Sequence, residues 1–218
     1  MIWREHYNHP AAWDTSFNLL SVPDMLLARA EEMPLAQLID FMGRKYSYAD
    51  VASAARRVAK GLLARGMRKG DRVGLFLPNV PHYVAAYYGA MMMGAIVVNF
   101  SPLYTLEELK HQAEDSGTKL LFTLSVKALL PRALDVMQQS CIEQLVVGSV
   151  AGALPIGKSL YYRFFKADGE AEFPAMFRAF PSLSPMTGIS SRYWSTRLPK
   201  SRCCNIPAAP PARPRVQC

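Results

Sequence analysis

The sequence predicts an α/β fold: a doubly wound, mostly parallel sheet covered by helices. Apolar runs typical of strands alternate with helical patterns of about a dozen residues, which is the order expected of βαβ units. The strand-like runs are continuously apolar rather than alternating, as in strands that are buried on both faces. The chain has 218 residues, of which 50% are hydrophobic and 19% charged. This composition excludes a disordered or collagen-like protein.

The first elements are recognised by their ends. Proline at the first turn predicts a helix over residues 23–33, and an apolar run predicts a short strand over 36–41. Helical spacing of apolar residues predicts a second helix over 49–65. Gly66 follows at the position where a left-handed cap commonly ends a helix.

The middle of the chain continues the alternation. A turn at Gly70-Asp71 precedes a buried strand over 72–77, and Asn79 is expected to cap a helix over 80–93. Thr105 and Glu108 have the spacing of a capping box, which predicts a further helix to about residue 116. The remaining expected elements are strands over 95–99, 119–124 and 142–148 and a helix over 126–139.

The composition changes near Pro185. Residues 186–218 contain six lysines and arginines, no aspartate or glutamate, and three of the four cysteines. We therefore divide the chain into residues 1–185, a partial domain, and residues 186–218, a basic tail that contains proline and cysteine and that we expect to be disordered. A basic tail with aromatic residues is also compatible with nucleic-acid binding, a reading that the origin of the tail, discussed below, removes.

Residues 73–106 contain no charged side chain, which raises the question of a membrane span. Prolines at 78, 81 and 102 interrupt the segment, and the uninterrupted part, 83–98, is shorter than the roughly 20 residues that a spanning helix needs. We interpret it as strand, helix and strand. A non-catalytic module that binds a membrane surface or another protein stays open as an alternative.

One stretch matches a known phosphate-binding pattern. Residues 152–159, Gly-Ala-Leu-Pro-Ile-Gly-Lys-Ser, fit G-x-x-x-x-G-K-S, in which Lys158 would reach phosphate. Three residues separate the preceding strand from Gly152, no second acidic strand can follow, and the stretch does not open the first βα unit. We interpret the match as coincidental and keep a P-loop-type nucleotide-binding protein that uses Gly152–Ser159 as an alternative.

Other candidate groups are explained by structure rather than chemistry. The four histidines show no metal-ligand spacing, and the tail cysteines lack C-x-x-C pairs. Met91, Met92 and Met93 fit an apolar helix in the core, and the acidic residues at 107, 108, 114 and 115 fit caps and solvated charges. We therefore assign no catalytic, cofactor-binding or metal-ligating residue within this chain.

Residues 46–124 carry a family resemblance. The matching stretches are Tyr-Ser-Tyr-Ala-Asp at 46–50, Gly-Met-Arg-Lys-Gly-Asp-Arg-Val at 66–73, Leu-Pro-Asn-Val-Pro at 77–81, and Gly-Ala-Ile-Val-Val-Asn-Phe-Ser-Pro-Leu-Tyr-Thr at 94–105. Glu-Glu-Leu at 107–109 and Asp-Ser-Gly at 115–117 follow. This part resembles the N-terminal domain of the adenylate-forming, AMP-binding enzymes, and most of all the long-chain fatty acid–CoA ligases. Weaker similarity runs from about residue 3 to 185.

The resemblance implies that the intact parent is an AMP-forming ligase that converts a long-chain fatty acid to acyl-adenylate and then acyl-CoA with ATP, Mg²⁺ and CoA. It implies no nucleic-acid partner and a cytoplasmic location, with peripheral contact at the inner face of the membrane left open. The matched positions are architectural. We expect the fragment alone to be inactive and to bind no cofactor, because the family's Thr/Ser/Gly-rich phosphate loop ending in Pro-Lys-Gly, due soon after residue 185, is absent.

The codons of residues 203–218 can encode that loop in a shifted reading frame. Residues 203–218 permit a back-translation that, with each codon begun one base earlier, reads Val-Leu-Gln-Tyr-Thr-Gly-Gly-Thr-Thr-Gly-Thr-Pro-Lys-Gly-Ala-Met. The first two bases of each codon, which the residue nearly fixes, become the last two of the shifted codon, so the match is constrained at every position. Our hypothesis is that one base was lost near the codon for Pro185 and that residues 186–218 are a frameshifted translation.

Overall fold

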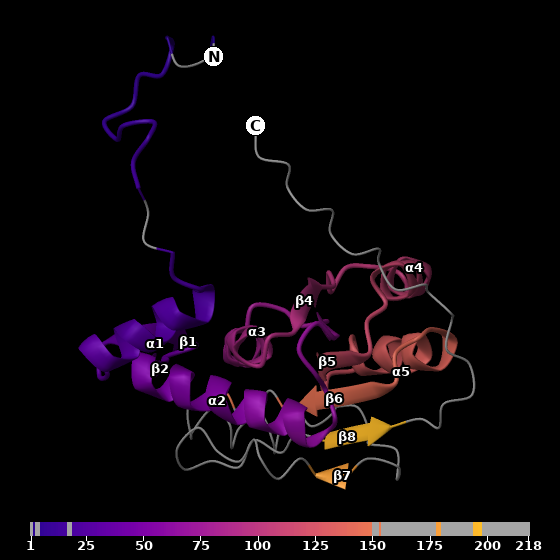
Figure 1. Ribbon diagram of the computed structural model, residues 1–218. Helices are drawn as coiled ribbons and strands as arrows, with labels where there is room; N and C mark the ends of the chain where they lie inside the picture. Colours follow the sequence, from indigo (N-terminus) through magenta and orange to yellow (C-terminus); the bar gives the residue numbers. More distant parts are fainter. Residues whose placement is uncertain are drawn as a thin grey trace.

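The computed structural model describes residues 2, 5–16, 19–149 and 153, and the backbone of 178–179 and 194–197. It confirms the α/β class, with helices on both faces of a mostly parallel sheet (Figure 1). The elements up to residue 149 are α1 (Val22–Glu32), β1 (Gln37–Phe41), β2 (Arg44–Ser47), α2 (Tyr48–Ala64), β3 (Arg72–Leu75), α3 (Pro81–Met92), β4 (Ile96–Asn99), α4 (Leu106–Ser116), β5 (Leu120–Leu124), α5 (Leu130–Gln139) and β6 (Gln144–Gly148).

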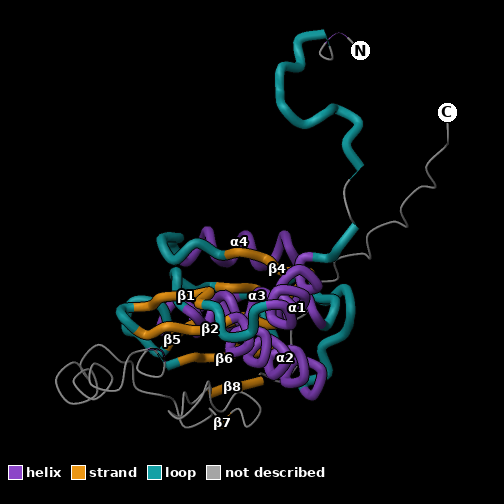
Figure 2. Tube along the Cα trace, turned by 90° about the vertical axis from the view of Figure 1, so that its left-hand side faces the viewer, coloured by secondary structure: helices purple, strands orange, loops and turns teal. Residues whose placement is uncertain are grey.

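The strand order confirms the doubly wound arrangement. Four parallel strands lie in the order β4-β3-β5-β6, so the chain moves outward from β3 to β4 and then crosses back to β5 and β6. Because crossovers between parallel strands are right-handed, this reversal puts α3 on one face and α4 and α5 on the other. Helix α2 packs beside α3, and α4 beside α5 (Figures 1 and 2).

Two short strands extend the sheet beyond β6. Strand β8 (Trp194–Arg197) pairs antiparallel with β6, and β7 (Arg178–Ala179) pairs antiparallel with β8. Strand β8 lies within residues 186–218, where we expect disorder. The rest of that segment lies outside the described residues, so its expected disorder and the proposed division at residue 185 remain predictions.

The hairpin β1–β2 is a feature that the sequence patterns did not predict. The two strands pair antiparallel through a turn at Met42 and Gly43, both with positive φ. Strand β2 ends at Ser47, whose side chain forms a capping box with Asp50 at the start of α2. The Ser-x-x-Asp spacing is present in the sequence, but a four-residue strand that carries Arg44 and Lys45 has no apolar strand pattern.

The expected helix ends are mostly confirmed, with one correction. Thr105 and Glu108 form the predicted capping box of α4, and Gly66 has φ of 81° just beyond the end of α2. Asn79 does not cap α3. That helix begins at Pro81 with Val80 at the N-cap position, and a valine side chain has no oxygen to accept a hydrogen bond from the first turn. Pro81 has no N–H to satisfy, and Tyr83 N–H donates to Val80 O (2.9 Å).

Helices α2 and α3 approach closely at Gly89. A Cβ atom at this position would lie 2.5 Å from Val58 Cβ and 2.7 Å from the Ala55 carbonyl oxygen of α2. The apolar side chains of α3 face both ways: Ala85, Ala86 and Ala90 belong to the main core, while others contact a second, smaller core that contains Leu26 and Tyr46. A helix that is apolar all round is one that is covered on more than one side.

We predict that Gly89→Ala destabilises the fold by about 1–3 kcal/mol, although alanine is the better helix former. The added methyl group meets α2 backbone and a β-branched side chain, so α2 and α3 must separate. Urea unfolding of the variant and the unchanged chain measures the difference. A stability equal to or above that of the unchanged chain would show that helix propensity outweighs the overlap.

His82 makes stability depend on pH. Its side chain is buried at the start of α3, and burial, followed by the charge of Arg44, lowers its pKa to about 4. The folded chain therefore binds fewer protons than the unfolded chain between pH 6.5 and about 4, so stability falls as pH decreases through this window.

We expect that loss to be on the order of 3 kcal/mol between pH 7 and pH 4, and to be largely absent in His82→Gln. Denaturant unfolding at several pH values measures it. The lowered pKa of Asp71 acts in a different window: the stabilisation that this carboxylate contributes is lost only below pH 3.8, its unfolded value. A His82→Gln profile that still falls between pH 6.5 and 4 would assign the effect to other groups.

Candidate functional site

The strand order defines one edge of the sheet as the candidate site. In doubly wound sheets, ligands bind beyond the carboxyl ends of the strands at the point where the strand order reverses. That point lies between β3 and β5. Backbone hydrogen bonds continue beyond the strands here: Phe76 N–H donates to Phe122 O (2.9 Å), Phe100 N–H to Leu75 O (3.0 Å) and Ser125 N–H to Gly148 O (2.9 Å). The loops that follow the strands therefore start in fixed positions.

Arg132 of α5 joins these loops. Its guanidinium donates to the carbonyl oxygens of Tyr104 (2.7 Å) and Pro102 (3.0 Å), in the loop after β4. It also donates to Ala128 O, in the loop after β5, from Nε (3.0 Å) and Nη2 (2.6 Å). The Arg132 Cζ atom lies 5.6 Å from the centre of the Phe76 ring, just after β3. One side chain thus contacts the segments that follow three parallel strands.

This geometry makes Arg132 a positioning residue. A guanidinium has five N–H donors in a planar fork, and here most of them point at main-chain carbonyl oxygens. The charge is balanced by carbonyl dipoles and the Phe76 ring. With most of its donors held by carbonyl oxygens, Arg132 acts on the loops and not as a binding group for phosphate. Sequence patterns gave no signal for this role, since all the partners are backbone atoms.

Asn99, at the end of β4, connects the helices on the two faces. The Tyr83 hydroxyl of α3 donates to Asn99 Oδ1 (3.0 Å), and Gln112 Nε2 of α4 donates to the Asn99 carbonyl (3.0 Å). Burial and then the neighbouring Tyr87 raise the pKa of Tyr83, so it stays protonated and donates. Asn99 belongs to the stretch that carries the family resemblance, and its contacts are architectural.

Two buried hydroxyls at the end of β5 were not predicted. Thr123 and Ser125 are 1% and 0% exposed, and their hydroxyl oxygens make no hydrogen bond among the described residues. Thr123 lies within β5 and Ser125 follows the last residue of that strand, next to the candidate edge. A buried serine and threonine in an apolar strand carry no sequence signal that separates this position from ordinary core.

The opposite edge of the sheet carries an ion pair. Lys119 Nζ, before β5, lies 2.5 Å from Asp71 Oδ1, before β3, and Arg68 N–H donates to Asp71 Oδ2 (2.8 Å). Burial alone would raise the pKa of Asp71, but the hydrogen bonds from Lys119 and Arg68 and their charges outweigh it and lower the pKa. The pair is part of the scaffold, because ligands of this fold bind at the other edge.

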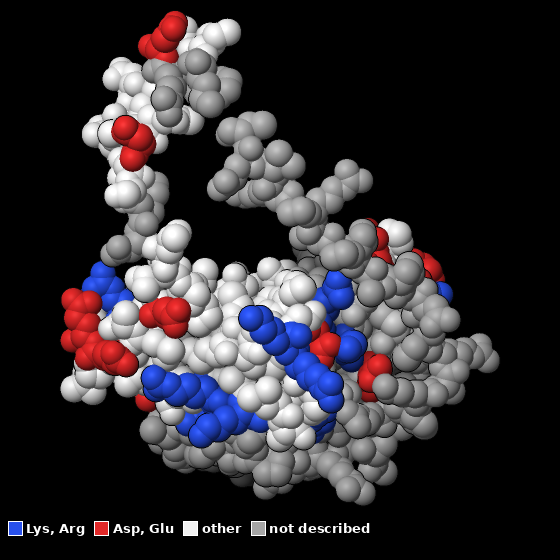
Figure 3. All heavy atoms as spheres, in the orientation of Figure 1, with Lys and Arg blue, Asp and Glu red and all other residues white. Residues whose placement is uncertain are grey.

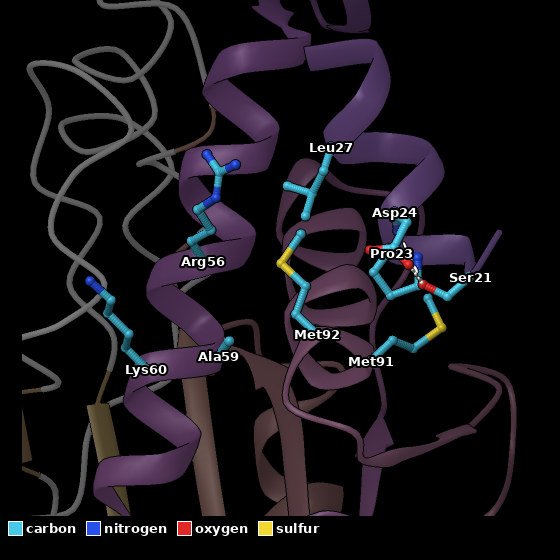
Figure 4. Close-up of a pocket in the computed structure, with 9 residues that line it drawn as sticks. All are labelled: Ser21, Pro23, Asp24, Leu27, Arg56, Ala59, Lys60, Met91 and Met92. Atoms are coloured by element: carbon cyan, nitrogen blue, oxygen red, sulfur yellow. Dashed lines mark hydrogen bonds between the residues drawn. The ribbon is translucent and has the colours of Figure 1, made fainter. Parts of the chain in front are cut away.

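A groove of about 380 Å³ lies on the helical side, away from the sheet edge (Figure 4). Met91 and Met92 line it and are half-buried, whereas Met93 is buried. The expectation that all three methionines fill the core holds for Met93 and in part for Met92, which packs against the smaller core around Leu26 and Tyr46, whereas Met91 belongs to neither core cluster. Successive side chains of α3 point in different directions around the helix axis, and only some of them face the sheet. The full lining is Ser21, Pro23, Asp24, Leu27, Arg56, Ala59, Lys60, Met91 and Met92.

The described residues cover the other sequence-derived candidates only in part. Of the G-x-x-x-x-G-K-S stretch, only Ala153 is described, and its carbonyl accepts a hydrogen bond from the Tyr46 hydroxyl (2.8 Å); Lys158 lies outside the described residues. Within the described part of the chain, no group of three or more His, Cys, Asp or Glu side chains could hold a metal ion. None of the helices described there is long and apolar enough to cross a membrane.

Comparison with known proteins gives consistent matches. The sequence model of a family described as "AMP-binding enzyme" matches residues 27–172. A long-chain-fatty-acid–CoA ligase from Bacillus subtilis is 32% identical over 160 residues, which cover 73% of this chain and 28% of the ligase. A 4-coumarate–CoA ligase from Arabidopsis thaliana is 39% identical over 88 residues, covering 40% of this chain and 16% of that enzyme.

A solved structure gives the same picture. The fatty acyl CoA synthetase of Mycobacterium tuberculosis superposes with a TM-score of 0.52 and 25% identity, covering 70% of this chain and 29% of the synthetase. The chain therefore spans less than a third of the length of these relatives.

We predict that Arg132→Ala and Arg132→Lys both destabilise the fold by about 1–3 kcal/mol. Lysine keeps the charge but cannot reach carbonyls in two loops at once. Arg57→Ala is the matched control, since among the described residues Arg57 makes one hydrogen bond, to Ser53 of its own helix (2.8 Å), and its loss should change stability by less than about 0.5 kcal/mol.

Amide hydrogen exchange tests the positioning role directly. Exchange should accelerate in residues 100–105 and 125–129 of the Arg132 variants and stay unchanged in β1 and β2. If Arg132→Lys behaves like the unchanged chain, a positive charge at this position is sufficient, and the fork geometry does not matter.

Proposed function

The chain belongs to the AMP-binding enzyme family, and from this premise we propose that it is the N-terminal part of an acyl-CoA ligase that activates a long-chain fatty acid. The observation that carries the proposal is the stretch Val-Val-Asn-Phe-Ser-Pro-Leu-Tyr-Thr at 97–105, together with 32% identity to a long-chain-fatty-acid–CoA ligase over 160 residues. In the structure this stretch forms the end of β4 and the loop that Arg132 holds.

The proposed reaction has two steps. A carboxylate oxygen of the fatty acid attacks the α-phosphorus of ATP, the bond between the α- and β-phosphates breaks, and acyl-adenylate and pyrophosphate form. The thiolate sulfur of CoA then attacks the acyl carbon and displaces AMP. Catalysis of such steps depends on positioning and on balancing the phosphate charge, with Mg²⁺ as one source of positive charge.

The described residues do not themselves fit ATP or Mg²⁺. At the candidate edge Arg132 is occupied by carbonyl oxygens, and the part of the chain that is described holds no cluster of acidic or histidine ligands. We therefore propose that this fragment supplies the scaffold and not the phosphate-binding groups. Those would come from the Thr-Gly-Gly-Thr-Thr-Gly-Thr-Pro-Lys-Gly loop encoded in the shifted frame after residue 202.

A second class of acid is favoured by one observation. The Arabidopsis thaliana relative acts, by its name, on 4-coumarate, and it is 39% identical over 88 residues. The long-chain acid is our first proposal, because the match to the Bacillus subtilis ligase covers 73% of this chain against 40%.

We predict that restoring the frame near codon 185 yields a ligase. The gene would be resequenced from codon 180 past the stop, the missing base inserted, and the protein assayed for CoA thioesters with palmitate and with 4-coumarate. Palmitate should give the higher kcat/KM. Changing the lysine of the restored Pro-Lys-Gly to alanine is the control and should lower kcat by at least about a hundredfold, as the loss of a transition-state charge contact does.

Two results would contradict the proposal. A gene whose third-base choices cannot encode the phosphate loop would remove the frameshift, and a restored chain that makes only 4-coumaroyl-CoA would replace the substrate. The 218-residue chain should bind no ATP. ATP binding that is lost in Lys158→Ala would favour the P-loop alternative instead.

A further inference from the structure

The groove between α1, α2 and α3 has the size and the lining of a ligand site, and it lies outside the candidate edge. Its volume of about 380 Å³ falls within the range of small-molecule sites. In Figure 4, Leu27 of α1 and Met92 of α3 point toward each other across it, while Met91 lies on the side of Pro23. Leucine, proline, alanine and two methionines give it an apolar floor, and flexible methionine side chains accommodate alkyl groups of varied shape.

The charges around the groove are asymmetric. Arg56 and Lys60 stand on the α2 wall, and both are exposed. Arg56 makes no ion pair or hydrogen bond among the described residues. Asp24, on the α1 wall, already accepts a hydrogen bond from the Ser21 hydroxyl (2.5 Å) as part of the helix cap. An unpartnered cation on one wall and a capped carboxylate on the other favour an anionic group on the α2 side.

We propose that this groove binds a single-chain anionic amphiphile, a fatty carboxylate, with its alkyl chain over Leu27, Met91 and Met92 and its carboxylate at Arg56. A guanidinium presents two parallel N–H groups that match a carboxylate, while the apolar lining of the groove offers a surface for the alkyl chain. The site is separate from the sheet edge and does not depend on the proposed ligase activity. It would hold a fatty acid without ATP or CoA.

The surroundings of the groove favour a free fatty acid over a membrane. Leu20, Val22 and Met25 are 53%, 45% and 52% exposed beside it, which would suit either ligand. However, Asp24, Glu31 and Glu32 lie on the same helix, and Figure 3 shows acidic side chains at the α1 end of this face. An anionic bilayer would cover these carboxylates and be repelled by them. A single fatty carboxylate at Arg56 would not have to lie against them.

The test is calorimetric titration of the 218-residue chain with decanoate and, separately, decanol at pH 7.5. We expect saturable decanoate binding at one site and at least tenfold weaker decanol binding. Arg56→Glu should weaken decanoate binding at least tenfold. Lys127→Glu is the matched control, since it makes the same charge change at an exposed position away from the groove and should leave affinity within twofold.

A second measurement locates the ligand. With methionine methyl groups labelled by carbon-13, decanoate should shift the Met91 and Met92 signals and leave those of Met67 and Met137, which are buried in the main core, unchanged. Ala59→Phe, which fills the groove, should abolish these shifts. If the Ala59 variant fails to fold, the Arg56 and Lys127 variants still test the proposal, because each of them changes an exposed side chain.

Three outcomes would overturn the proposal: equal binding of decanoate and decanol, an Arg56→Glu affinity within twofold of the unchanged chain, or shifts confined to methionines outside the groove. Flotation with phosphatidylglycerol vesicles distinguishes binding to a membrane surface from binding of a free fatty acid. Binding to vesicles that is lost in Arg56→Glu, without decanoate binding, would assign the same groove to a lipid surface. Ligase assays of a frame-restored chain do not enter this test, so the two proposals can fail independently.

Discussion

Burial of a parallel sheet on both faces is the constraint on which the rest of the structure depends. Strands β3, β5 and β6 are almost wholly apolar, and such strands are stable only under helices on each side. Right-handed crossovers then dictate that α3 lies opposite α4 and α5. The same reversal creates the carboxyl edge between β3 and β5 where ligands of this fold bind.

The close contact of α2 and α3 follows from that constraint. Gly89 lets the two helices approach closely enough to cover the sheet as one layer. Helix α3 then has apolar side chains on the side away from the sheet, where the small core around Leu26 and Tyr46 covers part of them. The groove lined by Met91 and Met92 is what remains uncovered. The apolar composition of α3, which raised the question of a membrane span, is thus explained by packing on two sides.

The candidate edge is organised but chemically incomplete. Arg132 and Asn99 fix the loops and helices around the strand ends through backbone carbonyls and a tyrosine hydroxyl. These contacts place loops accurately, as an enzyme that works by positioning requires. In the proposed ligase the reacting groups would be supplied by other segments, and this chain spans under a third of the length of its relatives.

The sequence by itself determined the fold class, most element boundaries and the family, because apolar periodicity, capping residues and the Val-Val-Asn stretch at 97–99 are local signals. The shifted phosphate loop also comes from the sequence alone, and it stays a hypothesis about the codons that the structure does not test. Only the tertiary structure decided the hairpin partner of β1, the role of Arg132, the buried state of His82 and the half-buried state of Met91 and Met92. These depend on which distant backbone atoms and helix faces meet, and contacts between residues far apart in the chain leave no periodic pattern in the amino acids that make them.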